Sequence, residues 1–185
     1  MVNARTPREA WVRAALDALT EGGPETVRVE VLAKRLGVTK GGFYGYFDGR
    51  AQLLSETLDL WEREAAQAVI DEVEQSQGDA QERLHSLFAS VKARENIARA
   101  EFAIREWARR DPAVAARLRR VDRARLDYLR ALHVELTGDA AEAAVRAAVM
   151  IGVWLAGHYM RFDTGNFDHD GVLELVFERM TSGAP

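Results

Sequence analysis

The sequence has 185 residues, of which 48% are hydrophobic and 29% are charged, and it carries a net charge of −4. These values are ordinary for a soluble globular protein that is long enough to form one large or two small domains. Cysteine is absent, which excludes disulfide bonds, thiol catalysis and cysteine-ligated zinc. The N-terminus has no apolar segment, and the longest apolar run, residues 147–157, is shorter than the about 18 residues that a membrane span requires. We therefore expect a cytoplasmic protein with no membrane partner.

Charge is unevenly distributed along the chain. Residues 1–50 hold eight Lys or Arg against six Asp or Glu, a balance of +2, whereas residues 51–185 hold 17 against 23, a balance of −6. A basic N-terminal segment on an acidic body is a modest indication of a module that binds a polyanion.

Three short helices are predicted in residues 1–49. The first begins near Thr6, a cap residue followed by a proline suited to the first helical position, and ends at residues 22–24, Gly-Gly-Pro. The second covers residues 29–36. A tight turn follows at residues 37–38, and the third helix, capped by Thr39, runs to about residue 47.

From residue 50 onward, apolar side chains recur at helical spacing in longer segments, and strand-like alternation is absent. Helices are expected over residues 50–76, 80–93, 95–110, 111–137, 140–162 and 171–181. The sequence therefore predicts an all-α protein of nine helices.

The glycine-rich stretch GVTKGGFYGYFDGR, residues 37–50, invites comparison with loops that bind phosphates. A Walker-type loop requires Lys and Ser or Thr where Phe43 and Tyr44 stand, and a dinucleotide fingerprint requires another glycine spacing; both also follow a strand. A helix, a turn containing glycine and a second short helix instead match a helix-turn-helix, which places its second helix in the major groove of DNA.

At this point the sequence resembles a known family. The run TVRVEVLAKRLGVTKGGFYGYFDGRAQLL, residues 26–54, is similar to the DNA-binding head of the tetracycline-repressor (TetR) family. The positions that fit the family pattern are Gly37, Val38, Thr39, Gly41, Phe43, Tyr44, Tyr46, Phe47, Arg50 and Leu53. The resemblance spans about residues 7–58. It implies a three-helix DNA-binding domain at residues 1–49 and a six-helix ligand-sensing and dimerisation domain at residues 50–185.

Several side chains of the head are suited to contacts with DNA. The hydroxyls of Thr and Tyr and the cationic groups of Lys and Arg bind phosphates. Phe43 and Phe47 are instead expected in the core. For Arg28 and Lys40, a solvated surface position is about as well supported as a contact with DNA. The predicted DNA-binding residues are Arg28, Thr39, Lys40, Gly41, Gly42, Tyr44, Tyr46 and Arg50.

The sequence departs from the family pattern at two positions. Where this chain has Gly42, the family usually has a residue with a small side chain, and where it has Gly45, the family usually has a larger residue. Three glycines in a helix of about eight residues cost on the order of 2–3 kcal/mol relative to alanine. We expect the recognition helix to be loose without DNA, to order on binding, and to depend more on DNA shape than on base contacts.

In the family that the head resembles, the last two helices form a four-helix bundle with a partner subunit. Ala148, Gly152 and Ala156 recur every four residues and form a smooth stripe on which another helix can lie; packing within one chain is the alternative. The predicted dimer-interface residues are Ala148, Gly152, Val153, Ala156, Met160, Val176, Phe177 and Met180.

A ligand pocket is harder to locate, because aromatic residues of a helical body most often belong to its core. The candidates for ligand contact are Trp61, Phe88, Phe102, Arg105, Trp107, Trp154 and His158. No metal-ligand spacing and no catalytic constellation is present, so no metal site, catalytic residue or cofactor is predicted.

Together these observations predict a TetR-like transcriptional regulator, most simply a repressor that binds a pseudo-palindromic operator in double-stranded DNA as a homodimer and is released by a small apolar or amphipathic effector. Two alternatives remain: a DNA-binding protein without a ligand, and a helical-bundle enzyme, which the missing site chemistry disfavours.

Overall fold

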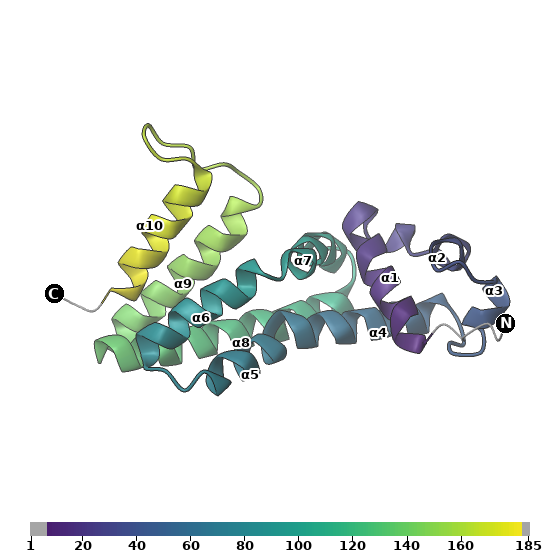
Figure 1. The fold of residues 1–185 in the computed structure, drawn as a ribbon, viewed down its shortest axis with the longest axis horizontal. Coiled ribbons are helices and arrows are strands. Elements are labelled where there is room, and N and C mark those ends of the chain that lie inside the picture. The colour runs from purple at the N-terminus through teal and green to yellow at the C-terminus, as the bar shows by residue number, and fades with distance from the viewer. Residues whose placement is uncertain (1–6, 183–185) are drawn as a thin grey trace. The chain divides into compact units, whose positions relative to one another are not determined.

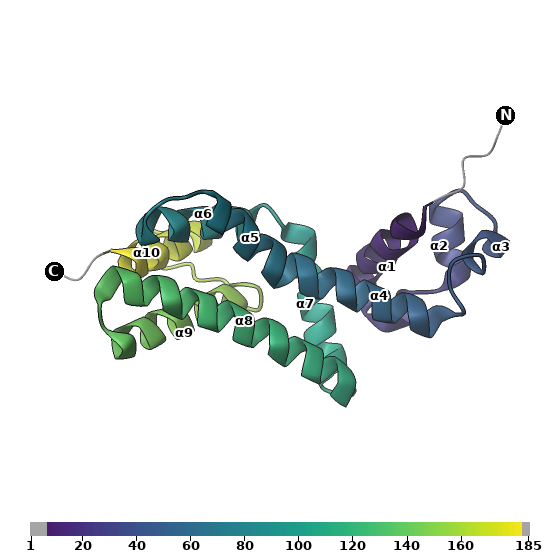
Figure 2. The ribbon, with the colours of Figure 1, turned by 90° about the horizontal axis from the view of Figure 1, so that it is seen from below.

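The computed structural model describes residues 7–182, whose regular elements are helices; in this range the only β-type pairing is one isolated bridge between Thr164 and Phe167. Figures 1 and 2 show the helices in two views. In chain order they are α1 (Arg8–Gly22), a 3-10 turn (Pro24–Thr26), α2 (Val29–Arg35), α3 (Lys40–Phe43), α4 (Arg50–Glu62), a π-helical segment (Arg63–Gln67), α5 (Ala68–Gln75), α6 (Ala80–Lys92), α7 (Glu95–Ala108), α8 (Pro112–Thr137), α9 (Ala140–Gly157) and α10 (His169–Thr181).

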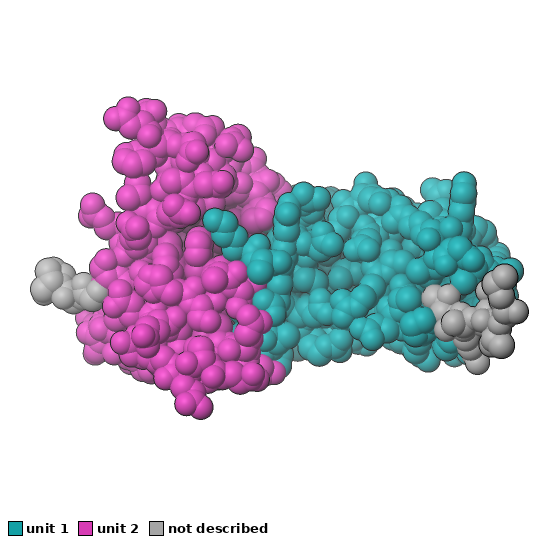
Figure 3. All heavy atoms as spheres, in the orientation of Figure 1, with its two compact units in different colours: residues 1–69, 91–121 teal, residues 70–90, 122–185 magenta. Residues whose placement is uncertain are grey.

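The chain divides into two compact units, coloured separately in Figure 3. Unit 1 consists of residues 1–69 and 91–121, and unit 2 of residues 70–90 and 122–185. The division follows packing rather than chain order, because α5, α6 and α8 each contribute to both units. The predicted division at residue 49 is a functional one and stays a prediction.

Within unit 1, α1, α2 and α3 group around the first turns of α4 (Figures 1 and 2). Aromatic residues fill the centre of this head. Trp11 and Phe43 have no exposed surface, and their ring centroids lie 5.4 Å apart in an edge-on arrangement. Phe43 also stacks on Phe47 with ring centroids 5.0 Å apart. Both phenylalanines are therefore core residues, as the sequence predicts.

The turn between α2 and α3 explains why glycine occupies position 37. Gly37 has a φ of +66°, a left-handed conformation that side chains disfavour. Its N–H donates to the carbonyl of Lys34 at 3.2 Å, and the N–H of Val38 donates to the carbonyl of Ala33 at 3.0 Å. These two bonds form a Schellman motif, which satisfies the last carbonyls of α2 and turns the chain into α3.

Buried and partly buried ion pairs lie in the rest of unit 1. Glu101 in α7 has no exposed surface, and its Oε1 accepts hydrogen bonds from Nε and Nη2 of Arg105, at 2.9 and 2.7 Å. Arg117 at the start of α8 donates to Asp59 at 2.5 Å and to Glu62 at 2.6 Å, both in α4. These contacts fix α8 against α4 next to the π-helical segment.

Unit 2 has a core of leucines and an alanine from α6, α8 and α9. Its buried members are Leu84, Leu129, Leu132 and Ala147. The α10 helix packs along α9, and Phe177 of α10 stacks on Phe88 of α6 with ring centroids 4.4 Å apart.

All the expected helical segments are present, but the one predicted over residues 50–76 is divided into α4, the π-helical segment and α5. Two boundaries also differ clearly. The predicted recognition helix, α3, ends at Phe43 instead of about residue 47, because residues 44–46 form a turn that brings Phe47 back into the core. The α9 helix ends at Gly157 instead of residue 162. Pro7 precedes α1 rather than opening it, and the predicted cap residue Thr6 lies outside the described residues.

Candidate nucleic-acid interface

The helix-turn-helix presents α3 as a single helical turn with little side-chain surface. Gly41 and Gly42 are exposed, and a Cβ built on Gly42 would meet no atom within 4 Å. Thr39 precedes the helix in an extended conformation, and its hydroxyl makes no capping hydrogen bond. The polypeptide backbone is therefore the main feature of this surface between Thr39 and Phe43.

Lys40 extends from this surface and forms an ion pair with Glu30 of α2. Both side chains are largely exposed, at 49% for Lys40 and 65% for Glu30. Their mutual hydrogen bond raises the pKa of Lys40 and lowers the pKa of Glu30. Lys40 is thus an exposed cation paired with a carboxylate that the prediction did not include, and its contact with DNA stays a prediction.

The two tyrosines differ in their exposure. Tyr44 is 57% exposed, and its ring stands edge-on to Phe43 with centroids 5.2 Å apart. Tyr46 is half-buried, and its ring lies 6.4 Å from that of Phe47. The Tyr44 hydroxyl therefore lies at the surface on a ring that the core supports, as a phosphate contact requires.

Arg50 has an internal role that sequence analysis missed. Its Nε donates to the carbonyl of Val27 at 2.7 Å, its Nη2 donates to the carbonyl of Pro24, and Glu25 lies 3.6 Å away. The guanidinium thus ties the start of α4 to the loop that precedes α2. Its contact with DNA stays a prediction, whereas these bonds within the head are part of the fold.

Arg28 occupies the residue before α2 and is exposed. Its Nε donates to the carbonyl of Glu25 at 3.3 Å, a long bond at the surface. This weak tie leaves the side chain suited to a partner outside the protein.

The predicted dimer-interface residues differ in their exposure. Ala148, Gly152 and Met160 are exposed, while Val153, Ala156, Val176 and Met180 are half-buried. Phe177 differs from the others, because it is only 7% exposed and stacks on Phe88 within the same chain. Phe177 therefore supports the position of α10 from within unit 2.

The exposed face of α9 is apolar. Val145 is 57% exposed and Val149 36%. By length and composition alone, α9 as a whole could cross a membrane, with a mean hydropathy of 1.4 over its 18 residues. The eleven-residue run considered in the sequence therefore understates the length of this apolar helix. In an oligomer, an exposed apolar helix face such as this one is typically covered by a helix of the partner.

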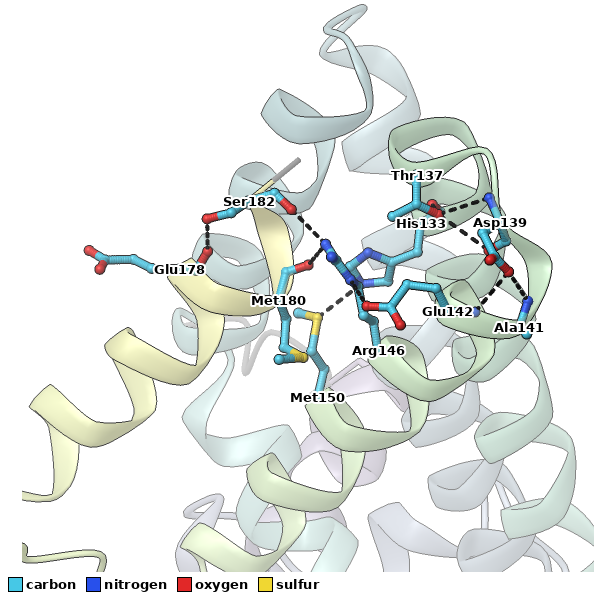
Figure 4. A network of polar contacts seen from close by, with 10 residues as sticks. All are labelled: His133, Thr137, Asp139, Ala141, Glu142, Arg146, Met150, Glu178, Met180 and Ser182. Atoms are coloured by element: carbon cyan, nitrogen blue, oxygen red, sulfur yellow. Dashed lines mark hydrogen bonds and ion pairs between the residues drawn. The ribbon is translucent and has the colours of Figure 1, made fainter. Parts of the chain in front are cut away.

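A polar network joins the C-terminal end of α10 to α9 (Figure 4). Arg146 is 8% exposed, and its Nη1 donates to the carbonyls of Met180 at 2.9 Å and Ser182 at 2.6 Å. Its Nε donates to Glu142 at 2.8 Å. In the same network His133 has no exposed surface, and its Nε2 lies 3.1 Å from the sulfur of Met150.

The residues predicted to contact a ligand are divided between the two units, and their contact with a ligand stays a prediction. Trp61, Phe102, Arg105 and Trp107 belong to unit 1, and Phe88, Trp154 and His158 to unit 2. Trp61 is fully buried, Arg105 is paired with Glu101, and Phe88 packs on Phe177. Trp154 and His158 lie together, with ring centroids 5.1 Å apart. Among the described residues, no group of His, Cys, Asp and Glu is arranged to hold a metal ion.

Comparison with known proteins identifies the head. Residues 12–57 match the family model of the bacterial regulatory proteins of the tetR family. The HTH-type transcriptional regulator BetI of Vibrio campbellii is 26% identical over 155 residues, which cover 79% of this chain and 77% of that relative.

Solved structures share the whole fold. A transcriptional regulator from Rhodococcus sp. RHA1 superposes with a TM-score of 0.69 at 21% identity, covering 95% of this chain and 94% of the other. A TetR/AcrR-family regulator from Thermobifida fusca has a TM-score of 0.63 at 20% identity, covering 96% and 98%. A regulator from Streptomyces coelicolor A3(2) has a TM-score of 0.62 at 23% identity, covering 95% and 98%.

Proposed function

The chain is a transcriptional regulator of the TetR family, and on this premise we propose that it acts as a repressor. It binds a pseudo-palindromic operator in double-stranded DNA as a homodimer, and a small apolar or amphipathic effector releases it. The proposed location is the cytoplasm, where the protein has access to DNA, and we propose no membrane partner.

The observation that carries this proposal is the geometry of the head. A Schellman turn at Gly37 links α2 to α3, and the buried Phe43 sets the exposed face of α3. Lys40 on that face and Tyr44 directly after the helix offer a cation and a hydroxyl, which are the groups that bind phosphates and base edges. The short α3 fits a major groove, because it has little side-chain bulk that would hold its backbone away from the bases.

The apolar face of α9 supports the dimer. Val145, Val149 and Met160 are exposed on α9 or just beyond it, and a second copy of the chain would remove them from water. A two-fold dimer carries two heads, so its operator consists of two inverted half-sites.

Release by an effector requires that the ligand bind one conformation of the protein better than the other. In the proposed mechanism, ligand bound in the helical body tilts α4, which begins at Arg50 directly after the head. The tilt changes the separation of the two heads, so both no longer fit the operator.

Gel-shift titration of the purified protein against the DNA upstream of its own gene tests the central claim. We expect a retarded complex that a specific competitor displaces and a nonspecific competitor does not. Absence of any preference over unrelated DNA, at moderate salt, would contradict operator binding.

Thermal-shift screening then separates a ligand-released regulator from a ligand-independent one. We expect at least one small apolar or amphipathic compound to raise the melting temperature and to dissociate the DNA complex. A reporter gene placed behind the operator separates repression from activation, because deleting a repressor raises the transcript.

A further inference from the structure

Lys40 is the one residue of α3 whose side chain reaches outward. Of the other three residues, Gly41 and Gly42 carry no side chain, and Phe43 has no exposed surface. In a helix-turn-helix, the first residues of the second helix contact base edges in the major groove. Base recognition by α3 therefore depends on Lys40 and on whatever side chain accompanies it.

Glu30 is the side chain that accompanies Lys40. It is the second residue of α2, and its carboxylate forms an ion pair with Nζ of Lys40 across the turn. The pKa of Lys40 is raised and that of Glu30 is lowered, both mainly through their mutual hydrogen bond, so both groups are charged at neutral pH. The pair presents a hydrogen-bond donor directly beside an acceptor.

Stability does not account for this pair. Both side chains are largely exposed, and exposed ion pairs contribute little to the free energy of folding. A carboxylate at this position also repels the phosphates of DNA, which weakens nonspecific binding. A role in distinguishing one base pair from another would account for a negative charge on this face.

We propose that Glu30 and Lys40 act as one element that recognises a single G·C base pair in each half-site of the operator. Nζ of Lys40 donates to O6 or N7 of the guanine, and the carboxylate of Glu30 accepts from the N4 amino group of the paired cytosine. This inference rests on the proposed operator binding, and it adds a specificity-determining residue, Glu30, outside the recognition helix.

The major-groove edge of the base pair explains the choice of G·C. Guanine offers two adjacent acceptors and cytosine offers the neighbouring donor, which complements a lysine beside a glutamate. An A·T pair places the O4 acceptor of thymine and its methyl group at the corresponding side. The Glu30 carboxylate would then face a second acceptor, so A·T is rejected by repulsion as well as by lost bonds.

The test is selection of binding sites from a random double-stranded DNA library by the full-length protein and by two variants, E30A and K40A. Affinities are then measured on the selected operator and on its single-base-pair variants. For the wild type, we expect one G·C pair per half-site whose replacement by A·T weakens binding roughly 5- to 150-fold. Both variants are expected to lose the preference at that same base pair and to keep it elsewhere.

E21A is the matched control, because Glu21 is an exposed acid of the same head that forms an ion pair with Arg35. It removes the same charge, and we expect its selected sequence to equal that of the wild type. An E30A consensus identical to the wild type, or changes at different base pairs in E30A and K40A, would overturn the inference. Unfolding of either variant, detected by circular dichroism, would also overturn it by making the pair structural. A wild type that selects no sequence would instead contradict the proposed function.

Discussion

Gly42 is a glycine that the fold itself does not require. Its φ is not in the left-handed region, and a Cβ there would meet no atom within 4 Å. Alanine is about 1 kcal/mol more favourable than glycine inside a helix. We predict that Gly42→Ala raises the free energy of unfolding by up to about 1 kcal/mol, measured by urea denaturation.

Gly37 provides the opposite case in the same motif. A Cβ at Gly37 would also meet no atom within 4 Å, but its φ of +66° is unfavourable for any other residue. Gly37→Ala is expected to lower the free energy of unfolding by about 1–2 kcal/mol. If both alanines changed stability in the same direction, the conformations assigned to these two glycines would be wrong.

Arg50 holds the head together through two backbone carbonyls, those of Val27 and Pro24. Arg50→Lys keeps the charge but cannot make both bonds with one ammonium group. We predict a loss of about 1 kcal/mol of stability, discounted for partial exposure, measured by urea denaturation without DNA. Arg28→Lys serves as the control, since Arg28 makes only one long bond, and it should leave stability unchanged.

His133 makes the stability of unit 2 depend on pH. Its pKa is lowered to about 4, mainly by burial and also by the positive charge of Arg146, while Glu142 opposes them. The histidine pKa of the unfolded chain is near 6.5, so between about pH 6.5 and pH 4 the unfolded chain binds a proton at His133 that the folded chain does not bind. We predict that stability is full above pH 6.5 and falls as the pH drops toward 4, by about 2 kcal/mol between pH 7 and pH 5.

Urea denaturation at several pH values tests the role of His133. His133→Gln removes the titrating group, so its stability should fall less between pH 7 and pH 5 than that of the wild type. His158→Gln, at an exposed histidine, should keep the wild-type slope. Equal slopes for wild type and His133→Gln would mean that other groups cause the pH dependence.

At the scale of elements, α3 shows how far periodicity reaches. Phe43 and Phe47 are spaced as on one helix, and both are buried as predicted. The chain nevertheless leaves the helix at residue 44 and reaches the core again through a turn. A four-residue spacing is compatible with both paths, so the length of α3 depends on packing around Trp11 rather than on local pattern.

The contact between α9 and α10 depends on Arg146. Its guanidinium satisfies the carbonyls of Met180 and Ser182, which end α10 without a helical partner of their own. We predict that Arg146→Met lowers the free energy of unfolding by about 2 kcal/mol and speeds amide exchange in the last turn of α10. The exposed Arg161 pairs with Asp163, and Arg161→Met should change neither measurement.

At the scale of the whole molecule, the apolar face of α9 predicts the oligomeric state. The subunit mass is 20.6 kDa, and we expect sedimentation to give twice that value for the wild type. Val145→Glu or Val149→Glu places a charge on this face, which a dimer can bury only at a large cost. Both variants should sediment as monomers and lose cooperative operator binding.

Val134→Glu is the matched control for the dimer. Val134 is a similarly exposed valine, 38% accessible, on α8 instead of α9. Its variant should remain a dimer. Dissociation by Val134→Glu together with intact dimers of the α9 variants would move the interface away from α9.

Some residues of the candidate site could be predicted from the sequence and others could not. The motif around Gly37 and Tyr44 identifies the head, because the glycine turn and the aromatic residues beside it are recognisable in the local sequence. Glu30 was missed, since nothing in the sequence joins it to Lys40 ten residues later. The ligand candidates were chosen by residue type alone, and type does not distinguish the buried Trp61 from the more accessible Trp154.

The sequence by itself determined the all-α class, the helix-turn-helix and the resemblance to the TetR family, because helical periodicity, caps and glycine turns are local properties of the chain. Only the tertiary structure decided which side chains are used inside the protein. Arg50 bonds the head, Phe177 packs on Phe88, and Lys40 meets Glu30. These outcomes depend on which helices the fold brings together, and distance along the chain does not encode that proximity.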